Sequence, residues 1–233
     1  MKSTKLLALL MLTLALVAVS AQATPLAPGG NGVPVGETVP AGLTLLASSG
    51  QVNWMAPGAP GAGMASGTLE SAVYKTTAGT LDFVYQYTND PTSTAGISQT
   101  TGLSFAMGFC CNSVDADFFS NGSALGSGFV NGTAIPQLVA RSAAPGIVVT
   151  WTYNFPTDAT DINPGQTGAV LVIATDATAF QTGTLGLIAG GTFTDVNVFE
   201  PAPAGGVPEP AMFLPLGAGL MGFALFRRRR ARA

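Results

Sequence analysis

The central part of the chain, residues 41–199, alternates short runs of strand-forming residues with turns rich in Gly, Pro and Asn. Residues 81–87 (LDFVYQY) carry apolar and polar side chains in alternation and precede the turn Asn89-Asp90-Pro91, which is typical of a strand. Residues 169–175 (AVLVIAT) are continuously apolar, as in a strand buried on both faces. No segment between the two chain ends keeps a helical period, so the predicted fold class is all-β.

Further segments of this central part have the composition of strands, and glycine, proline or asparagine interrupts them. They are residues 43–46, 73–75, 103–109, 146–154, 186–189 and 196–199. Many short strands joined by turns predict an antiparallel β-sandwich body, with a β-barrel as the alternative. Without its apolar ends the chain keeps about 180 residues, which suits one domain with its own core.

Charged residues are scarce, at 9% of the chain, against about 25% in an average soluble domain. Between residues 24 and 206 the cations are Lys75 and Arg141, which face eleven carboxylates, so this part has a net charge of about −9. A body with so few cations cannot replace the counterions of a phosphate backbone. Nucleic acid is therefore not expected as a partner.

The first 23 residues have the pattern of a secretory signal peptide. Lys2 and Lys5 form a positive start, residues 6–19 are apolar, and Ala21 and Ala23 form a small-x-small cleavage signal. The Pro/Gly-rich segment 24–40 comes next and favours cleavage over the alternative, an uncleaved membrane anchor. We expect signal peptidase to cut after Ala23.

The other end contains an uncharged stretch, residues 211–226, followed at once by arginines. As a helix with a 1.5 Å rise per residue it would span about 24 Å, and arginine snorkelling can extend this toward the roughly 30 Å hydrocarbon core. A basic cluster beside a membrane span stays in the cytoplasm, so the body is expected on the opposite side. The sequence thus predicts a single transmembrane helix with a cytoplasmic cluster of Arg227, Arg228, Arg229, Arg230 and Arg232.

Directly before this helix stands the motif Val207, Pro208, Glu209, Pro210. The motif, the short apolar helix and the arginine block, in this order over residues 207–233, resemble the PEP-CTERM sorting signal. The resemblance implies that an exosortase in the cytoplasmic membrane recognises Pro-Glu-Pro and processes the tail, and that the protein then passes to the cell surface or the exopolysaccharide matrix. The alternative is a plain membrane anchor after a Pro-rich linker, residues 200–206.

The chain contains no histidine, which excludes Ser-His-Asp and Cys-His catalysis and a histidine-bound zinc. Lys75, the one lysine of the body, has no serine motif around it. Paired carboxylates can hydrolyse glycosides, but no pair here stands in a recognisable motif. We therefore expect no enzyme activity, no cofactor and no metal.

Cys110 and Cys111 are the only cysteines, and they are neighbours. Their Cα atoms lie about 3.8 Å apart across a trans peptide, below the usual range for a disulfide, so a bridge between them would strain the backbone. A bridge between neighbours, intermolecular bridges and free thiols all remain open, and the bridge between neighbours is favoured over free thiols.

Two segments are rich in oxygen-bearing side chains: residues 112–117 (NSVDAD) and 158–163 (DATDIN). Such side chains could ligate calcium, but neither segment has the spacing of an EF-hand loop. Asx turns explain both without a metal, and we prefer that interpretation.

The aromatic side chains of the body allow two interpretations. They could form a platform for sugar rings or belong to the sandwich core, and the core is favoured because aromatic pairs on one strand face are usually buried. These residues are Trp54, Tyr85, Tyr87, Trp151 and Tyr153.

Together, these features predict an exported, non-enzymatic protein of the cell surface or exopolysaccharide matrix. The alternative is a carbohydrate-binding surface module, and a remote one is a carboxylate-based hydrolase. The expected partners are signal peptidase, an exosortase-type enzyme, the cytoplasmic membrane as a transient anchor, and extracellular polysaccharide. The expected divisions are residues 1–23, 24–40, 41–199, 200–206 and 207–233.

The cleavage signal gives a first test. In an exporting bacterial host, the mature protein should begin at Thr24, because signal peptidase cuts after small-x-small sequences. N-terminal sequencing checks this, and a variant with leucine at both Ala21 and Ala23 should stay uncut. Recovery of Met1 from the wild-type membrane fraction would show an uncleaved anchor instead.

Overall fold

The structure is a computed structural model that describes residues 25–58, 63–102, 104–106, 110–154 and 161–203. The expected signal peptide, the Pro-Glu-Pro motif, the apolar helix and the arginine cluster lie outside these residues. The described ranges belong to the body between the two ends of the chain.

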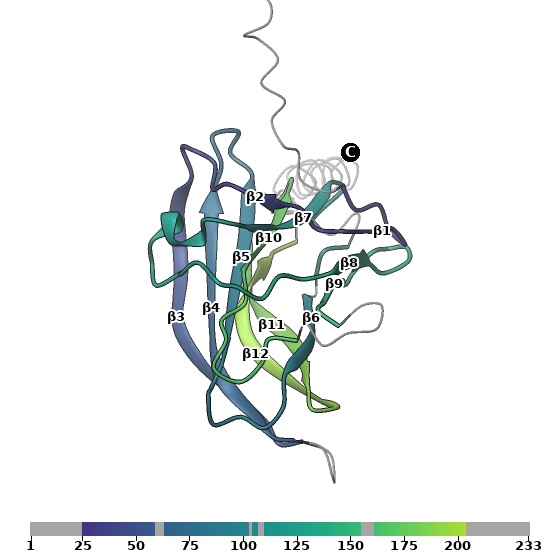
Figure 1. Ribbon diagram of the computed structural model, residues 1–233. Helices are drawn as coiled ribbons and strands as arrows, with labels where there is room; N and C mark the ends of the chain where they lie inside the picture. Colours follow the sequence, from purple (N-terminus) through teal and green to yellow (C-terminus); the bar gives the residue numbers. More distant parts are fainter. Residues whose placement is uncertain (1–24, 59–62, 103, 107–109, 155–160, 204–233) are drawn as a thin grey trace, which may run out of the picture.

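The described residues form two stacked six-stranded sheets (Figure 1). One, sheet A, has the order β2-β7-β10-β5-β4-β3, and the other, sheet B, has the order β1-β8-β9-β6-β11-β12. The strands of sheet A are β2 (Gly36–Glu37), β3 (Thr44–Ala56), β4 (Ala65–Lys75), β5 (Leu81–Asn89), β7 (Val114–Phe119) and β10 (Val170–Thr175). Those of sheet B are β1 (Asn31–Gly32), β6 (Ile97–Gly102), β8 (Leu138–Arg141), β9 (Val149–Thr152), β11 (Phe180–Ala189) and β12 (Thr192–Pro201).

The predicted all-β class is confirmed, and each sheet ends in two different edge strands, so neither closes into a barrel within the described residues. The pairs are antiparallel except for β2 and β7, which run parallel. The sheets are therefore not purely antiparallel, because the chain enters sheet A from the N-terminal segment along the edge of β7.

The main core lies between the two sheets and contains the large aromatic side chains of both. From sheet A, Phe83, Tyr85 and Tyr87 of β5 point into it, since side chains two apart share a strand face. From the other side, Trp151 and Tyr153 enter the same cluster. Phe83 also meets the ring of Phe105 edge-on, with ring centres 6.0 Å apart.

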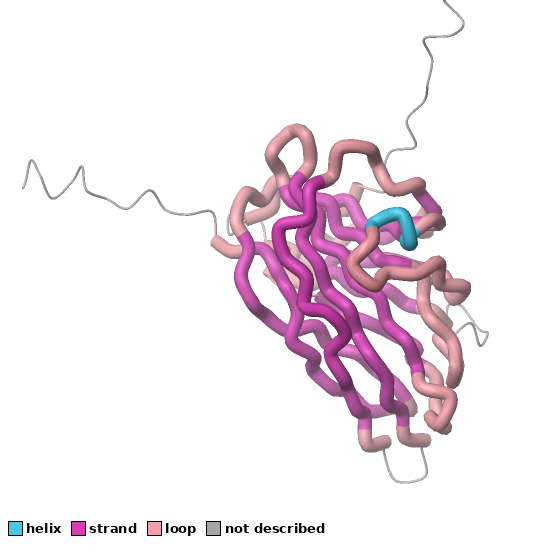
Figure 2. Tube along the Cα trace, turned by 90° about the vertical axis from the view of Figure 1, so that its left-hand side faces the viewer, coloured by secondary structure: helices cyan, strands magenta, loops and turns pink. Residues whose placement is uncertain are grey.

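A third layer covers the outer face of sheet A. The short 3₁₀ helix η1 (Gly122–Leu125), drawn in cyan in Figure 2, and the loop after it lie over the strands. A second apolar cluster fills the space beneath, with Val84 on β5, Val172 on β10 and Phe129 in the loop. Both faces of β5 and β10 are therefore buried, as the continuous apolar run of residues 169–175 predicts.

The glutamine Gln86 fixes this third layer. Its amide nitrogen donates to the carbonyls of Val130 (2.7 Å) and Gly168 (2.9 Å), and its amide oxygen accepts from the Val130 N–H (2.9 Å). One neutral side chain on β5 thus holds two loop segments against the sheet.

Most of the predicted strand segments coincide with strands, but of the predicted segment 103–109 the described residues, 104–106, do not. β6 ends at Gly102, and residues 104–106 lie outside the strands, with Ser104 at a positive φ of 68°. The apolar composition there reflects the burial of Phe105 in the core and not a strand. The Asx-turn interpretation of Asp115 and Asp117 is also wrong, because both stand in the middle of β7.

The segments expected to be loose at either end of the body take part in the sheets. Residues 24–40 contain β1 and β2, and Leu26 is buried in the main core. At the other end β12 runs through Glu200 and Pro201, the first residues of the expected linker. The two sheets therefore extend nearly to the segments in which signal-peptide cleavage and tail processing are expected.

Candidate functional site

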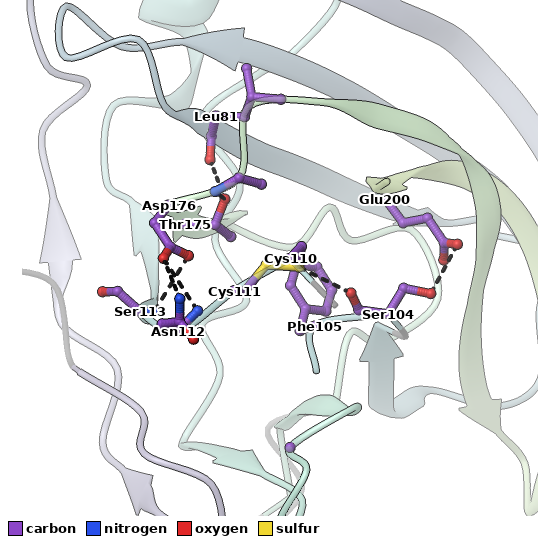
Figure 3. The surroundings of a disulfide bond; sticks show 12 residues. Leu81, Ser104, Phe105, Cys110, Cys111, Asn112, Ser113, Thr175, Asp176 and Glu200 are labelled. Atoms are coloured by element: carbon purple, nitrogen blue, oxygen red, sulfur yellow. Dashed lines mark hydrogen bonds between the residues drawn. A yellow bond between two sulfur atoms is a disulfide. The ribbon is translucent and has the colours of Figure 1, made fainter. Parts of the chain in front are cut away.

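Three features lie close together at one end of the sandwich: the cysteine pair, a buried arginine and a group of acidic side chains. Cys110 and Cys111 form a disulfide with each other (Figure 3). The Cys111 side chain is fully buried, and both backbone N–H groups of the pair donate to the Ala106 carbonyl (3.3 Å each). Of the alternatives that the sequence leaves open, the structure contains the bridge between neighbours.

The loop around the disulfide is tied to two strands (Figure 3). The Cys110 sulfur lies 3.3 Å from the Ser104 carbonyl, and the Ser104 hydroxyl donates to Glu200 of β12 (3.0 Å). On the other side, Asp176 accepts from the backbone N–H groups of Asn112 (3.3 Å) and Ser113 (3.4 Å). The disulfide segment is thus held between the ends of β10 and β12.

Arg141, at the end of β8, lies beneath this segment and is almost fully buried. Its guanidinium donates to the carbonyls of Leu26 and Cys111 (3.0 Å each), Gly146 (3.0 Å) and Phe105. Burial lowers the pKa of Arg141, and the negative charge of Asp176 opposes that shift. The planar fork of a guanidinium suits such a set of carbonyls, because several N–H groups point outward in fixed directions.

The acidic side chains gather on the outer face of sheet A. Asp82 on β5 and Asp115 on β7 are both register partners of Ala174 on β10, so they flank this small residue on one face. Asp176 joins them in lining a cleft of about 420 Å³, which we call the acidic cleft. Glu37 on β2 is close enough to influence the pKa of Asp82.

Burial makes these carboxyl groups harder to ionise. It raises the pKa of Asp82 to about 7, with a further contribution from Glu37. The pKa of Asp115 rises through burial and the nearby charge of Asp117, and that of Glu37 rises through burial and both of these aspartates. Asp117 itself accepts a hydrogen bond from the Val35 N–H, which connects the group to the N-terminal segment.

The described residues contain no group of three or more Asp, Glu, Cys or His side chains placed to hold a metal ion. Of the two segments considered for calcium, residues 112–117 run into β7, and Asp158 of the other lies outside the described residues. The aromatic side chains considered for a sugar platform are all buried, which confirms the core interpretation. Their exposed fractions are 5% or less for Trp54, Tyr85, Tyr87, Trp151 and Tyr153.

Sequence reasoning missed the role of Arg141. The signal was present, since it is one of two cations in a body with eleven carboxylates and stands directly after an apolar run. Its four carbonyl partners come from three regions of the chain, and only the fold brings Leu26, Phe105 and Cys111 to the arginine. The pairing of Asp82 with Asp115 likewise results from strand register and not from spacing along the chain.

Replacing Arg141 should strongly destabilise the protein. Arg141→Met leaves four buried carbonyls without donors, so we expect a loss of roughly 3–5 kcal/mol in the free energy of unfolding. Arg141→Lys should recover only part of this, because one ammonium group cannot reach all four carbonyls. Urea unfolding checks both, with Lys75→Met, at an exposed cation, expected within about 0.5 kcal/mol of wild type. Equal stability of Arg141→Met and wild type would contradict this role.

The acidic cleft should make stability depend on pH. The pKa of Asp82 is raised from 3.8 to about 7, so the folded state holds a proton that the unfolded state has released. Its stabilising effect is present below about pH 4 and is lost as the pH rises through 7. Asp115 and Glu37, whose pKa values are also raised, act in the same direction. The free energy of unfolding should therefore fall between about pH 4 and pH 7 and level off at higher pH.

Asp82→Asn, which stays neutral, should flatten this dependence and raise stability at about pH 8 by roughly 1–3 kcal/mol. Urea unfolding across the pH range measures it. Asp195→Asn, at an exposed position of β12, serves as the control for removing one carboxylate. A pH profile of Asp82→Asn identical to that of wild type would exclude Asp82 as its source.

No helix among the described residues is long and apolar enough to cross a membrane. Comparison with models of protein families, with curated proteins and with solved structures finds no match for this chain. Its function is therefore inferred from the chain's own residues.

Proposed function

We propose that this chain is an exported, non-enzymatic protein of the cell surface or exopolysaccharide matrix, sorted by an exosortase-type enzyme. The observation that carries the proposal is the order of three features over residues 207–233: the motif with Glu209, an uncharged stretch of helical length, and the arginine cluster. A signal peptide at the other end gives the same orientation across the membrane.

The physical arrangement of the tail supports recognition outside the cytoplasm. The arginines hold the C-terminus inside, because moving charge across hydrocarbon is costly. The helix 211–226 then places the motif at the outer boundary of the membrane. Pro208 and Pro210 keep the segment extended, and Glu209 is the only charge that it presents.

The tail is tested by Glu209→Ala in a host that has an exosortase. The variant loses the charge of the motif but keeps the anchor and its orientation. It should therefore accumulate at full length in the cytoplasmic membrane, while the wild type is shortened and appears at the surface or in the matrix. Cell fractionation with intact-mass analysis measures both, and Asp195→Ala controls for the loss of an acidic residue elsewhere.

Replacement of the arginines should give a different result, a failure to retain the C-terminus in the cytoplasm during export. If Glu209→Ala matures and localises like the wild type in such a host, Pro-Glu-Pro is no sorting signal and the tail is a plain anchor.

A further inference from the structure

A second cleft, distinct from the acidic cleft, opens on the outer face of sheet A beside the third layer. Its volume is about 240 Å³. Two rows of cross-strand neighbours line it. The first row crosses β3, β4 and β5, and its consecutive register partners are Gln51, Glu70 and Gln86. In the second row Thr68 pairs with Thr88, and Thr88 forms a bridge with Thr167. Register partners share a face, so these polar side chains converge. We call this the Glu70 cleft.

Glu70 is the unusual member of this set. Its side chain is only 4% exposed, and its one hydrogen bond within the described residues is a long one, from the Ser48 hydroxyl at 3.5 Å. Neither of the two cations of the body forms an ion pair with Glu70 within the described residues, since Lys75 is exposed and Arg141 donates to backbone carbonyls. A buried carboxylate without a full set of donors is costly, and such an exception requires an explanation.

The walls around Glu70 are built and fixed. The backbone of Gly128 (φ +92°) comes so close to the Glu70 carboxylate that any Cβ there would collide with it. Both polar atoms of the Gln86 amide are used by the loop segments that they hold. The hydroxyl oxygens of Thr88 and Thr167 lie 3.0 Å apart and share a hydrogen bond. The Glu70 carboxylate, with one long hydrogen bond, keeps unused acceptor capacity within these walls.

The side chains that line the cleft limit the chemical classes of ligand that it can bind. An anion would be repelled by Glu70. A bound metal ion usually takes several carboxylate ligands, and the described residues contain no group of three or more Asp, Glu, Cys or His side chains placed to hold one. Hydroxyl groups of a ligand fit, because they can donate to the carboxylate and accept from threonine hydroxyls and from the Gln51 amide. The volume is below the roughly 300–1,000 Å³ of sites for drug-sized ligands, which suits a single sugar ring.

We propose that the Glu70 cleft binds one residue of a neutral polysaccharide, with the Glu70 carboxylate accepting hydrogen bonds from two sugar hydroxyls. This goes beyond the proposed function, because it concerns a ligand of the body and not the route of export. It also differs from an aromatic sugar platform, since the recognising groups are a carboxylate and hydroxyls.

The test uses the purified full-length chain in a zwitterionic detergent, because a detergent with a sugar headgroup would compete. Maltotriose, cellotriose and mannotriose are titrated and followed by saturation-transfer NMR and calorimetry. Wild type should bind at least one of them saturably. Glu70→Gln, which keeps the shape but loses the charge, should weaken that binding at least tenfold, and Thr88→Val should weaken it several-fold. Asp82→Asn, in the acidic cleft, should bind like wild type.

Thermal unfolding verifies that each variant is folded, and trigalacturonate, an anionic trisaccharide, should bind at least tenfold more weakly than the best neutral one. The proposal is overturned if wild type binds none of the three neutral sugars, or if Glu70→Gln binds as tightly as wild type. Binding that requires added calcium and is abolished by EDTA would overturn it as well, because the carboxylate would then hold a cation. None of these outcomes depends on how the tail is processed.

Discussion

The buried guanidinium of Arg141 is the interaction on which one end of this sandwich depends. Its hydrogen bonds reach the N-terminal segment at Leu26, the loop after β6 at Phe105, the disulfide at Cys111 and the turn after β8 at Gly146. The N-terminal segment, the stretch between β6 and β7 that contains Phe105 and Cys111, and the turn after β8 are three separate regions of the chain. The side chain of Arg141 thus supplies hydrogen bonds to backbone carbonyls in loops, where no neighbouring strand can supply them.

Polar side chains that bind backbone recur as connectors throughout the body. Gln86 holds the third layer by its amide, Tyr85 donates from the core to the Phe199 carbonyl of β12 (2.7 Å), and Ser71 accepts from the Phe199 N–H (3.0 Å). Tyr85 and Ser71 belong to sheet A, and together they provide hydrogen-bond partners for the Phe199 backbone on β12, an edge strand of sheet B. Neutral hydrogen bonds across the layers give specificity without the desolvation cost of buried ion pairs, which suits a chain so poor in charge.

Strands with a clear local pattern of apolar and polar residues can be predicted from the sequence, whereas features that depend on contacts between distant segments cannot. Residues 81–87 and 169–175 could be predicted because alternation and continuous apolarity are local properties. Residues 104–106, part of the predicted segment 103–109, are not a strand, because Phe105 is buried from a loop. The strand β7 is not predicted, because Asp115 and Asp117 are typical of turns. The Glu70 cleft was beyond prediction, since register across β3, β4 and β5 assembles it. The tail motif stays a prediction, because it lies outside the described residues.

The position of the N-terminal segment bears on when the expected signal peptide would be removed. Pro25 already bridges to Asp115, Leu26 donates to the Val114 carbonyl (2.8 Å), and Arg141 binds the Leu26 carbonyl. Only Thr24 separates these contacts from the expected cut after Ala23. A cut at this position would fall one residue before a segment that the fold uses. If the expected cleavage takes place, it should therefore precede closure of the Arg141 end, which would couple removal of the signal peptide to the final folding step.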